Sequence, residues 1–172
     1  MTNYYNSEIL TEKIQINFNE INTKDINTKI YSILKNKVEN KCYKSGYIIQ
    51  NSIKIINKTL GKIVNYDSNS MIEYNIRFSV KIIKPTIDDI IQCYISEKNK
   101  LGILAYIKYK DIIENDNKNN DINESPLLII IPMETITDID KYDSDMKIKI
   151  IVKATRVKFD ANKIQVIGNI ED

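Results

Sequence analysis

The feature that most constrains the fold is a long alternation of apolar and polar residues between Met71 and Ile83. Apolar side chains occupy every second position from 72 to 82, and polar or charged side chains lie between them. Successive side chains of a strand point to opposite faces, so the pattern predicts a long strand with one buried face. Pro85 ends it, because proline has no amide hydrogen for the sheet. A strand of this length can cross between two domains.

The segment before this strand is predicted to contain a strand and then a helix. Alternation at positions 14–18 indicates a half-buried strand. From 24 to 38 the apolar residues recur at helical spacing and the lysines lie off that face, which predicts an amphipathic helix. The residues on the apolar face are Ile26, Ile30, Ile33 and Leu34.

Short apolar runs follow the predicted helix. Residues 47–49 and 53–56 are expected to form the two strands of a hairpin. Gly61 is expected to open a short strand or turn, and residues 65–70 to form a polar loop.

The second half of the chain is predicted to be almost entirely strand and loop. Its five strand-like segments have the spacing of a small closed β-barrel of OB type. A polar insertion at about 111–125 is expected to be a solvated loop, and it lacks the glycine of a calcium-binding loop. The five segments are residues 90–96, 101–109, 127–131, 146–157 and 163–170.

Composition argues against several classes of protein. The 25 basic and 23 acidic residues nearly cancel, which disfavours non-specific coating of DNA. The chain has no histidine, so catalytic sites and zinc sites that need imidazole are excluded. Ile, Lys, Asn and Tyr together account for 92 of 172 residues, and their AT-rich codons point to an AT-rich genome.

Cys42 and Cys93 are 51 residues apart in the chain, and no CxxC motif exists. We therefore expect two free thiols in a reducing compartment. The N-terminus lacks the pattern of a signal peptide, and the longest apolar run, 127–131, is far too short to span a membrane. These observations predict an intracellular protein with no membrane partner.

The residues offer little for catalysis. The carboxylates cluster at Asp88 and Asp89 and along an acidic string at 138–145, in polar surroundings typical of a solvated surface. No serine or cysteine can be matched with a histidine base, and no phosphate-binding loop is present. We expect no catalytic residues, no metal site and no cofactor. The acidic string consists of Asp138, Asp140, Asp143 and Asp145.

Binding is the better prediction. An OB-type barrel binds single-stranded nucleic acid through a cationic groove and aromatic stacking platforms. The sequence interleaves such residues in two places, along the first two barrel strands and on the closing hairpin. The candidates are Tyr94, Tyr106 and Tyr109 with Lys98, Lys100, Lys108 and Lys110, and then Arg156 and Lys158. The alternative for each tyrosine is a role in the core.

Three stretches in order resemble the stalk subunit of multisubunit DNA-directed RNA polymerases, the family of the seventh subunit of eukaryotic polymerase II and its archaeal counterpart. KVENKCYKSGYII at 37–49 is similar to the family's helix end and Gly-aromatic-Ile-Ile strand. The stretch 60–107 resembles it in Gly61-Lys62-Ile63, in the linker at Lys84-Pro85 and in a Leu-Gly step at 101–102. IKIIVKATRVKFDANKIQVIGNIED at 148–172 resembles the C-terminal hairpin. Asp88 stands where the family usually has glycine before the first barrel strand.

The resemblance implies an α+β, mainly β architecture with two domains. Residues 1–83 would form an N-terminal tip domain, a helix packed on an antiparallel sheet, and residues 84–172 an OB-fold barrel. The tip would dock on the polymerase core and contact a small helical partner subunit, while the barrel would face nascent RNA. The implied docking residues are Gly61, Lys62, Ile63, Asn65 and Tyr66; those expected to bind RNA are Lys98, Lys100, Tyr106, Lys108, Arg156 and Lys158.

The sequence therefore predicts a non-catalytic stalk subunit of an RNA polymerase, acting in transcription. A large DNA virus or a protist would fit the composition, so the expected location is a virion or viral factory, or otherwise the nucleus. One alternative is a free-standing OB-domain RNA-binding protein in translation or RNA turnover. Another is a scaffolding protein that has kept the fold and lost RNA contact.

Overall fold

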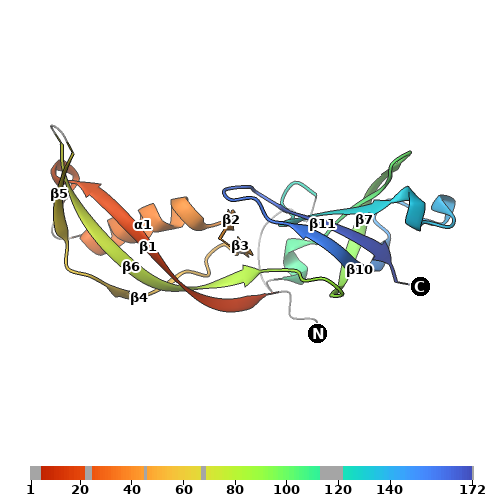
Figure 1. Ribbon diagram of the computed structural model, residues 1–172, viewed down its shortest axis with the longest axis horizontal. Helices are drawn as coiled ribbons and strands as arrows, with labels where there is room; N and C mark the ends of the chain where they lie inside the picture. The colour runs from red at the N-terminus through yellow and green to blue at the C-terminus, as the bar shows by residue number, and fades with distance from the viewer. Residues whose placement is uncertain (1–4, 22–24, 45, 67–68, 113–121, 172) are drawn as a thin grey trace. The chain divides into compact units, whose positions relative to one another are not determined.

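A computed structural model describes residues 5–21, 25–44, 46–66, 69–112 and 122–171. The described chain is mainly β, with one α-helix and two sheets (Figure 1). Its contacts group into two compact units. The sheet unit comprises Ser7–Glu39 and Ile48–Ile82, and the barrel unit comprises Met1–Asn6, Asn40–Tyr47 and Ile83–Asp172. The division into domains at 1–83 and 84–172 stays a prediction, because clustered contacts do not test which segments fold independently.

The predicted long strand is confirmed as β6, the strand around which the six-stranded sheet is organised. The main strand order is β1-β6-β3-β2, and β4 and β5 also pair with β6. The alternating residues Ile76, Phe78, Val80 and Ile82 are all buried, as one face of a half-buried strand requires. The strands are β1 (Asn6–Asn17), β2 (Cys42–Tyr43), β3 (Gly46–Ile48), β4 (Lys54–Lys58), β5 (Lys62–Tyr66) and β6 (Asn69–Ile83).

The predicted helix is confirmed as α1 (Ile26–Val38). Its buried residues Ile30, Leu34 and Val38 recur at every fourth position, so they form one apolar stripe. The ammonium group of Lys37 donates a hydrogen bond to the Glu12 carboxylate, which links the polar side of α1 to β1 in the sheet unit. Residue 24, where we expected the helix to begin, lies outside the described residues.

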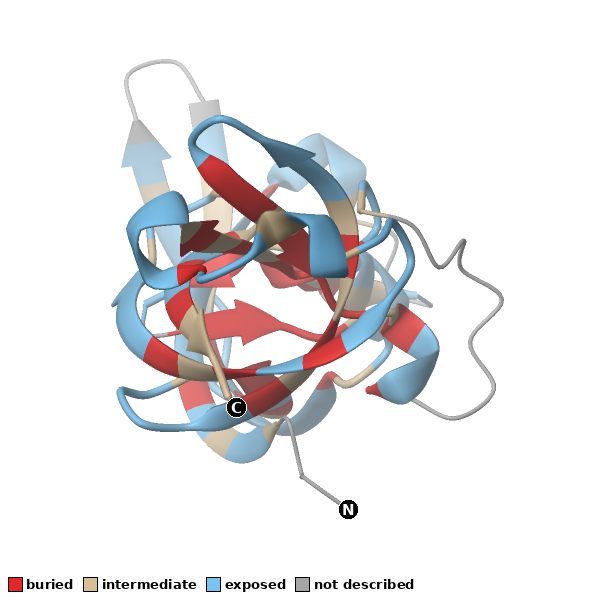
Figure 2. Ribbon diagram, turned by 90° about the vertical axis from the view of Figure 1, so that its right-hand side faces the viewer, coloured by how far each residue is buried: buried red, intermediate tan, exposed pale blue. Residues whose placement is uncertain are grey.

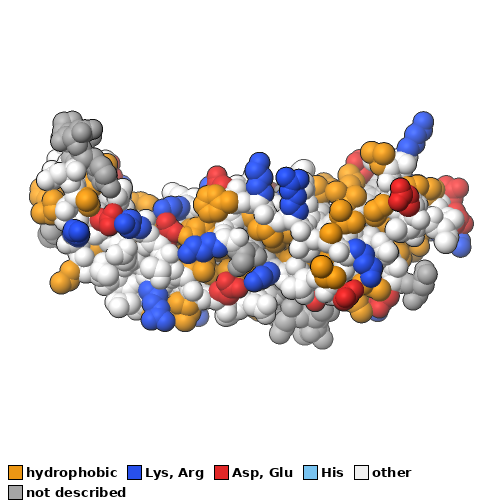
Figure 3. Space-filling model, in the orientation of Figure 1, with side chains coloured by type: hydrophobic (Ala, Val, Ile, Leu, Met, Phe, Trp, Pro, Cys, Tyr) orange, Lys and Arg blue, Asp and Glu red, His pale blue; other side chains and the backbone are white. Residues whose placement is uncertain are grey.

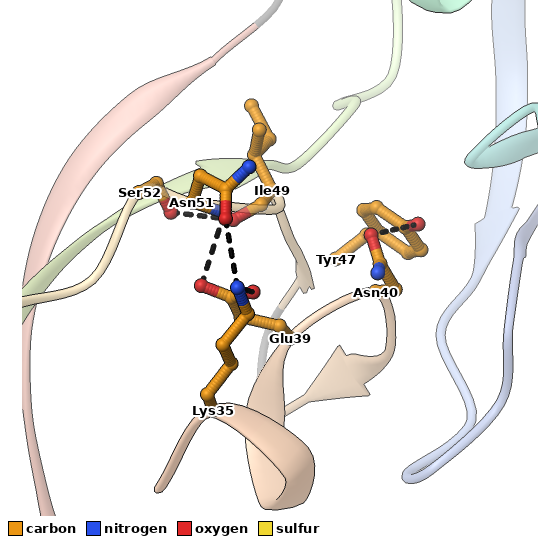
Figure 4. A network of polar contacts seen from close by, with 7 residues as sticks. All are labelled: Lys35, Glu39, Asn40, Tyr47, Ile49, Asn51 and Ser52. Carbon is orange, nitrogen blue, oxygen red and sulfur yellow. Dashed lines mark hydrogen bonds and ion pairs between the residues drawn. The ribbon is translucent and has the colours of Figure 1, made fainter. Parts of the chain in front are cut away.

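The expected hairpin of 47–49 and 53–56 is wrong. β3 pairs with β2, where Cys42 lies opposite Tyr47, and β4 pairs with β6. Both strands pair with the long strand β6 and not with each other, and the turn between them is shown in Figure 4. The buried carboxylate of Glu39 accepts the Asn51 amide N–H at 3.0 Å, and Lys35 donates to the Asn51 side chain at 2.9 Å. Asn51 has a φ of 55°, which Asn tolerates better than most residues.

The predicted closed barrel is confirmed, and each of the five predicted segments contributes one strand. The cyclic order is β10-β11-β9-β8-β7, with β7 pairing again with β10. Neighbours are antiparallel except for β9 and β11, which are parallel. Figure 2 shows buried residues alternating with exposed ones around the ring. The strands are β7 (Ile90–Asn99), β8 (Gly102–Tyr106), β9 (Leu127–Pro132), β10 (Lys147–Arg156) and β11 (Ile164–Ile170).

Two positions near the barrel strands depend on unusual backbone conformations. Gly102 has a φ of 137°, and a Cβ atom there would lie 2.0 Å from the Ile131 carbonyl oxygen, so only glycine fits. Asp88, which replaces the glycine expected from the family, has a φ of 68°. The left-handed region favours glycine but admits Asp, so this departure keeps the required backbone. The amide of Asp88 donates to the Val152 carbonyl at 2.8 Å.

The chain after β8 departs from the expected strand at 101–109. Residues Tyr109–Asp111 form a 3-10 turn, and Tyr109 is buried. Of the expected polar loop at 111–125, residues 113–121 lie outside the described part. Next to it, the buried Ser125 hydroxyl accepts the Ile107 amide N–H at 3.2 Å, which anchors the chain as it enters β9.

Candidate functional site

The residues expected to dock on a polymerase lie on β5 and immediately before it. β5 pairs antiparallel with β6, with Ile63 opposite Ile72. Gly61 precedes β5, and a Cβ atom there would lie 2.5 Å from Ile72 Cγ2 and 3.0 Å from the Tyr74 ring. Position 61 therefore requires glycine, because two side chains of β6 pack closely against it.

The same region exposes apolar side chains to an unusual degree. Ile63 is 62% exposed and Leu60 is 94% exposed. On β4, where every residue is exposed, Ile56 is 52% and Ile55 is 38% exposed. We call Ile55, Ile56, Leu60 and Ile63 the apolar edge. Sequence reasoning found Ile63 and missed the others, although Leu60 stands directly before the predicted turn at Gly61.

The polar residues near the apolar edge have partners on the sheet. Lys62 lies opposite Glu73, whose carboxylate accepts from Gln15 at 2.9 Å and pairs with Lys13 at 3.1 Å. These contacts lower the pKa of Glu73, with a further contribution from the charge of Lys62. The Asn65 side chain accepts from the Ser70 hydroxyl at 3.0 Å.

Tyr66, the last residue of β5, lies opposite Asn69 in the backbone register, and its side chain is outside the description. Among the predicted docking residues whose side chains the structure describes, Ile63 is the exposed apolar one.

The residues expected to bind RNA do not form one surface. Lys98 lies near the end of β7 and Lys100 in the turn to β8. Arg156 ends β10, and Lys158 lies in the loop that follows. Because β10 runs antiparallel to β7, with Lys147 opposite Tyr94, these two pairs of basic residues lie at opposite ends of the barrel.

The tyrosine rings that were expected to stack on bases are covered by other residues of this chain. Tyr106 is 4% exposed, and its hydroxyl donates to Asp145 at 3.1 Å. Its ring lies 6.1 Å from that of Tyr94, and the ammonium of Lys108 sits 3.8 Å from the centre of the Tyr94 ring. Tyr109 is buried. Neither Tyr106 nor Tyr109 offers an open face to a base, and Lys108 is engaged by a cation–π contact.

Carboxylates of the two acidic clusters accept hydrogen bonds from nearby residues of the same loops. Asp89 accepts the Thr86 amide and hydroxyl at 2.7 and 2.8 Å. Asp138 caps a 3-10 turn by accepting the Asp140 amide at 3.1 Å. Within the described residues, no group of three Cys, Asp or Glu side chains is arranged to hold a metal ion.

The two cysteines are free, as predicted, and both are buried. Burial raises the pKa of the Cys42 thiol to about 11 and that of Cys93 to about 12, so both thiols are protonated near neutral pH. A search of the described helices for one long and apolar enough to cross a membrane finds none.

The structure adds a feature at the β10–β11 end of the barrel that sequence reasoning identified only in part. A concave pocket of about 400 Å³ lies there, on the outer side of β9, β10 and β11. Arg156 and Lys158 line it, and the neighbouring Phe159 is 67% exposed. The available signal was a phenylalanine set among charged residues in a predicted turn. The full lining is Leu128, Arg156, Lys158, Ala161, Asn162, Lys163 and Gln165.

Comparison with models of protein families gives no match for this chain, and comparison with curated proteins gives none either.

Proposed function

We propose that this chain is a non-catalytic stalk subunit of a DNA-directed RNA polymerase. The sheet unit docks on the core enzyme, and the barrel is presented toward the exiting transcript. The proposal rests on the resemblance of three ordered sequence stretches and on two features of the fold.

The observation that carries the docking proposal is the apolar edge. Four large apolar side chains within one short segment are exposed, among them Leu60 at 94% and Ile63 at 62%. Large apolar side chains left exposed to water are costly, and several of them on one segment are typical of a contact site for another protein. Of the residues that the family resemblance assigns to docking, Gly61, Lys62 and Ile63 fall in this segment, and Asn65 and Tyr66 follow it on β5.

The topology of the barrel supports an OB-type domain. In chain order its strands are arranged first, second, third, fifth and fourth, and the fourth pairs with the first. The third and fifth strands are the parallel pair. This arrangement belongs to the five-stranded Greek-key barrels that bind oligonucleotides.

The test is affinity purification of the tagged full chain from its source cells, with stoichiometry measured by mass spectrometry. We expect the two largest polymerase subunits at near one-to-one ratio. A Leu60→Ser, Ile63→Ser variant should lose them, because it removes the apolar anchor while leaving the core intact. The matched control is Leu101→Ser, which changes an 84%-exposed leucine of the barrel and should retain the polymerase.

A second candidate function is a free-standing RNA-binding protein in translation or RNA turnover. The basic pocket at the β10–β11 end favours it, since that pocket needs no polymerase to bind a ligand. Recovery of ribosomal proteins or ribonucleases without polymerase subunits would contradict the stalk proposal and support this alternative.

A further inference from the structure

The outer face of the barrel carries a row of aliphatic side chains that crosses four strands. Leu104 on β8 lies opposite Ile130 on β9, and Ile130 lies opposite Ile167 on β11. Ala154 on β10 completes the row, because it lies opposite Ile167 on the other side of β11. The residues on either side of Leu104, Ile130 and Ile167 in the chain are buried, so the row points away from the core. We call these four residues the aliphatic row.

The aliphatic row is partly exposed to water. Ile167 is 43% exposed, Ala154 is exposed, and Leu104 and Ile130 are half-buried. Figure 3 shows hydrophobic side chains at the surface of the barrel. Because the barrel is closed, it has no open strand edge to which a partner could add a strand. A partner on this face must therefore be bound by side chains.

The side chains on this face do not suit nucleic acid. β8 and β9 are the second and third strands of the barrel, which form the face on which OB barrels bind oligonucleotides. Binding of single strands there relies on aromatic rings that stack on bases. The half-buried residues of β8 and β9 are Leu104, Leu128, Ile130 and Pro132, and none of them is aromatic or basic. This face therefore matches the apolar side chains of a protein better than a base.

The two ends of the aliphatic row differ in charge. At the β7 end, the exposed Glu97 lies opposite Leu104. At the β10 end, Arg156 lies two residues beyond Ala154, and Lys158 lines the same pocket of about 400 Å³. Within the described part of the chain, neither Arg156 nor Lys158 has an ion-pair partner. A ligand that covers the row therefore meets negative charge at one end and unpaired positive charge at the other.

We propose that the aliphatic row binds an amphipathic helix of a partner protein, with acidic residues of that helix lying over Arg156 and Lys158. Neighbouring strands are about 4.8 Å apart and successive turns of a helix about 5.4 Å, so apolar residues one turn apart reach neighbouring strands. Four strands span about 14 Å, which about ten helical residues cover. The inference goes beyond the proposed function, because the resemblance assigns both the polymerase contact and the small helical subunit to the tip.

The test selects peptides from a phage-displayed library of random sequences of about 15 residues, enough for four helical turns. The full chain is the target, and the Ile167→Thr protein is the parallel target that identifies peptides bound elsewhere. We expect the enriched peptides to carry apolar residues at helical spacing, with Asp or Glu near one end. The most enriched peptide is then synthesised with a fluorescent label, and its affinity for each variant is measured by anisotropy.

Substitutions in the row and beside it should have different effects on this affinity. Ile167→Thr keeps a β-branched side chain but should weaken binding about ten-fold, because it removes a central apolar contact. The matched control is Ile90→Thr, at a 45%-exposed isoleucine of β7 outside the row, which should change affinity less than about two-fold. Arg156→Gln with Lys158→Gln should weaken binding about five-fold, and the difference should shrink at high salt. Circular dichroism shows whether each variant is folded.

A further variant separates this inference from the proposed function. Leu60→Ser with Ile63→Ser alters the apolar edge of the sheet unit and should leave the peptide affinity unchanged. If that variant keeps the peptide but loses the polymerase subunits, the two surfaces act separately. If polymerase subunits fail to co-purify with the unaltered chain but the peptide results hold, the docking proposal fails and this inference stands.

Several results would overturn the proposal. One is a selection that enriches no peptide over the Ile167→Thr protein, or enriches peptides without helical spacing of apolar residues. Another is an equal loss of affinity in Ile90→Thr and Ile167→Thr. Displacement of the peptide by a single-stranded oligonucleotide that Ile167→Thr also binds more weakly would make the face a nucleic-acid site. A dimer in light scattering that becomes a monomer in Ile167→Thr would make a second copy of this chain the occupant.

Discussion

The closed barrel and the strands β4 and β5 of the sheet are both rich in isoleucine, but they differ in how far their isoleucines are buried. In the barrel every strand has two neighbours, and Ile103, Ile129 and Ile150 are fully buried. In the sheet unit, β4 and β5 pair with β6, and their isoleucines face solvent. Closure removes strand edges, whereas an open edge must be covered or left to a partner. The outward-facing Ile90 and Ile167 of the barrel are also partly exposed, at 45% and 43%, so the exposure of an isoleucine in this protein depends on its strand and on the face to which it points.

The largest loss of stability is expected from a substitution at Gly102 in the barrel, where a Cβ atom has the least room. Gly102→Ala should reduce the free energy of unfolding by about 3–5 kcal/mol, because the new methyl group meets backbone atoms and the residue must keep a positive φ. The measurement is urea denaturation followed by circular dichroism. Gly61→Ala is the matched change in the sheet unit, where the methyl group meets only side chains. It should cost less; equal losses at both glycines would contradict the comparison.

The buried thiols sharpen the comparison through pH, since both belong to the barrel unit. A buried thiol keeps its proton, but the same thiol in the unfolded chain releases it above its ordinary pKa of 9.0. Stability should therefore fall as the pH rises from about 9 toward 11 for Cys42 and 12 for Cys93, by about 1 kcal/mol per thiol at pH 10.

The measurement for the thiols is denaturation under reducing conditions on both sides of this pH window. A variant with Cys42→Ala and Cys93→Ala loses stability at neutral pH but should show a smaller alkaline decrease than the unaltered chain. An equal alkaline decrease in the two proteins would show that other groups cause it.

Removal of a single methylene should distinguish the buried isoleucines from the exposed ones. Ile150→Val in the barrel and Ile76→Val on β6 should each cost about 1 kcal/mol, because both side chains are fully buried. Ile63→Val should change stability by less than about 0.5 kcal/mol, since most of that side chain already faces water. A comparable loss at Ile63, measured by the same denaturation curves, would mean that the apolar edge is covered in solution.

The smallest effect is expected at Asp88. Glycine relieves the cost of a positive φ, but it adds freedom to the unfolded chain and removes an exposed ion pair with Lys153 at 3.5 Å. These contributions nearly cancel, so Asp88→Gly should shift stability by no more than about 0.5 kcal/mol. Asp89→Gly is the contrasting change and should destabilise more, because it removes both hydrogen bonds to Thr86. A large loss at Asp88 would show that its side chain matters more than its backbone.

Most of the secondary structure was predictable, because a half-buried strand and an amphipathic helix each have a period that residues alone reveal. β6, α1 and the five barrel strands are all visible in this way. The hairpin predicted at 47–56 was wrong in its pairing: both segments are strands, but they do not pair with each other. Both strands pair with β6, and the Asn51 amide between them donates to the buried Glu39 carboxylate, a contact that no periodic pattern in the sequence records.

The candidate sites were predictable only in part, for a related reason. Lys98, Lys100, Arg156 and Lys158 are equally basic in the sequence, and strand register alone separates them to opposite ends of the barrel. Tyr106 has the right side chain for stacking, but its hydroxyl is bound to Asp145 and its ring is buried. Phe159 was overlooked because the exposure of its ring is a property of the folded loop and not of its position in the sequence.

The sequence by itself determined the periods, the strand count of the barrel, the lack of imidazole chemistry and the presence of two cysteines outside any CxxC motif. These are properties of single residues and of their spacing along the chain. Only the tertiary structure decided which strands pair, which isoleucines remain exposed, and which basic residues line the same pocket. Those properties arise from contacts between residues far apart in the chain, and their energies depend on burial, which exists only after the chain has folded.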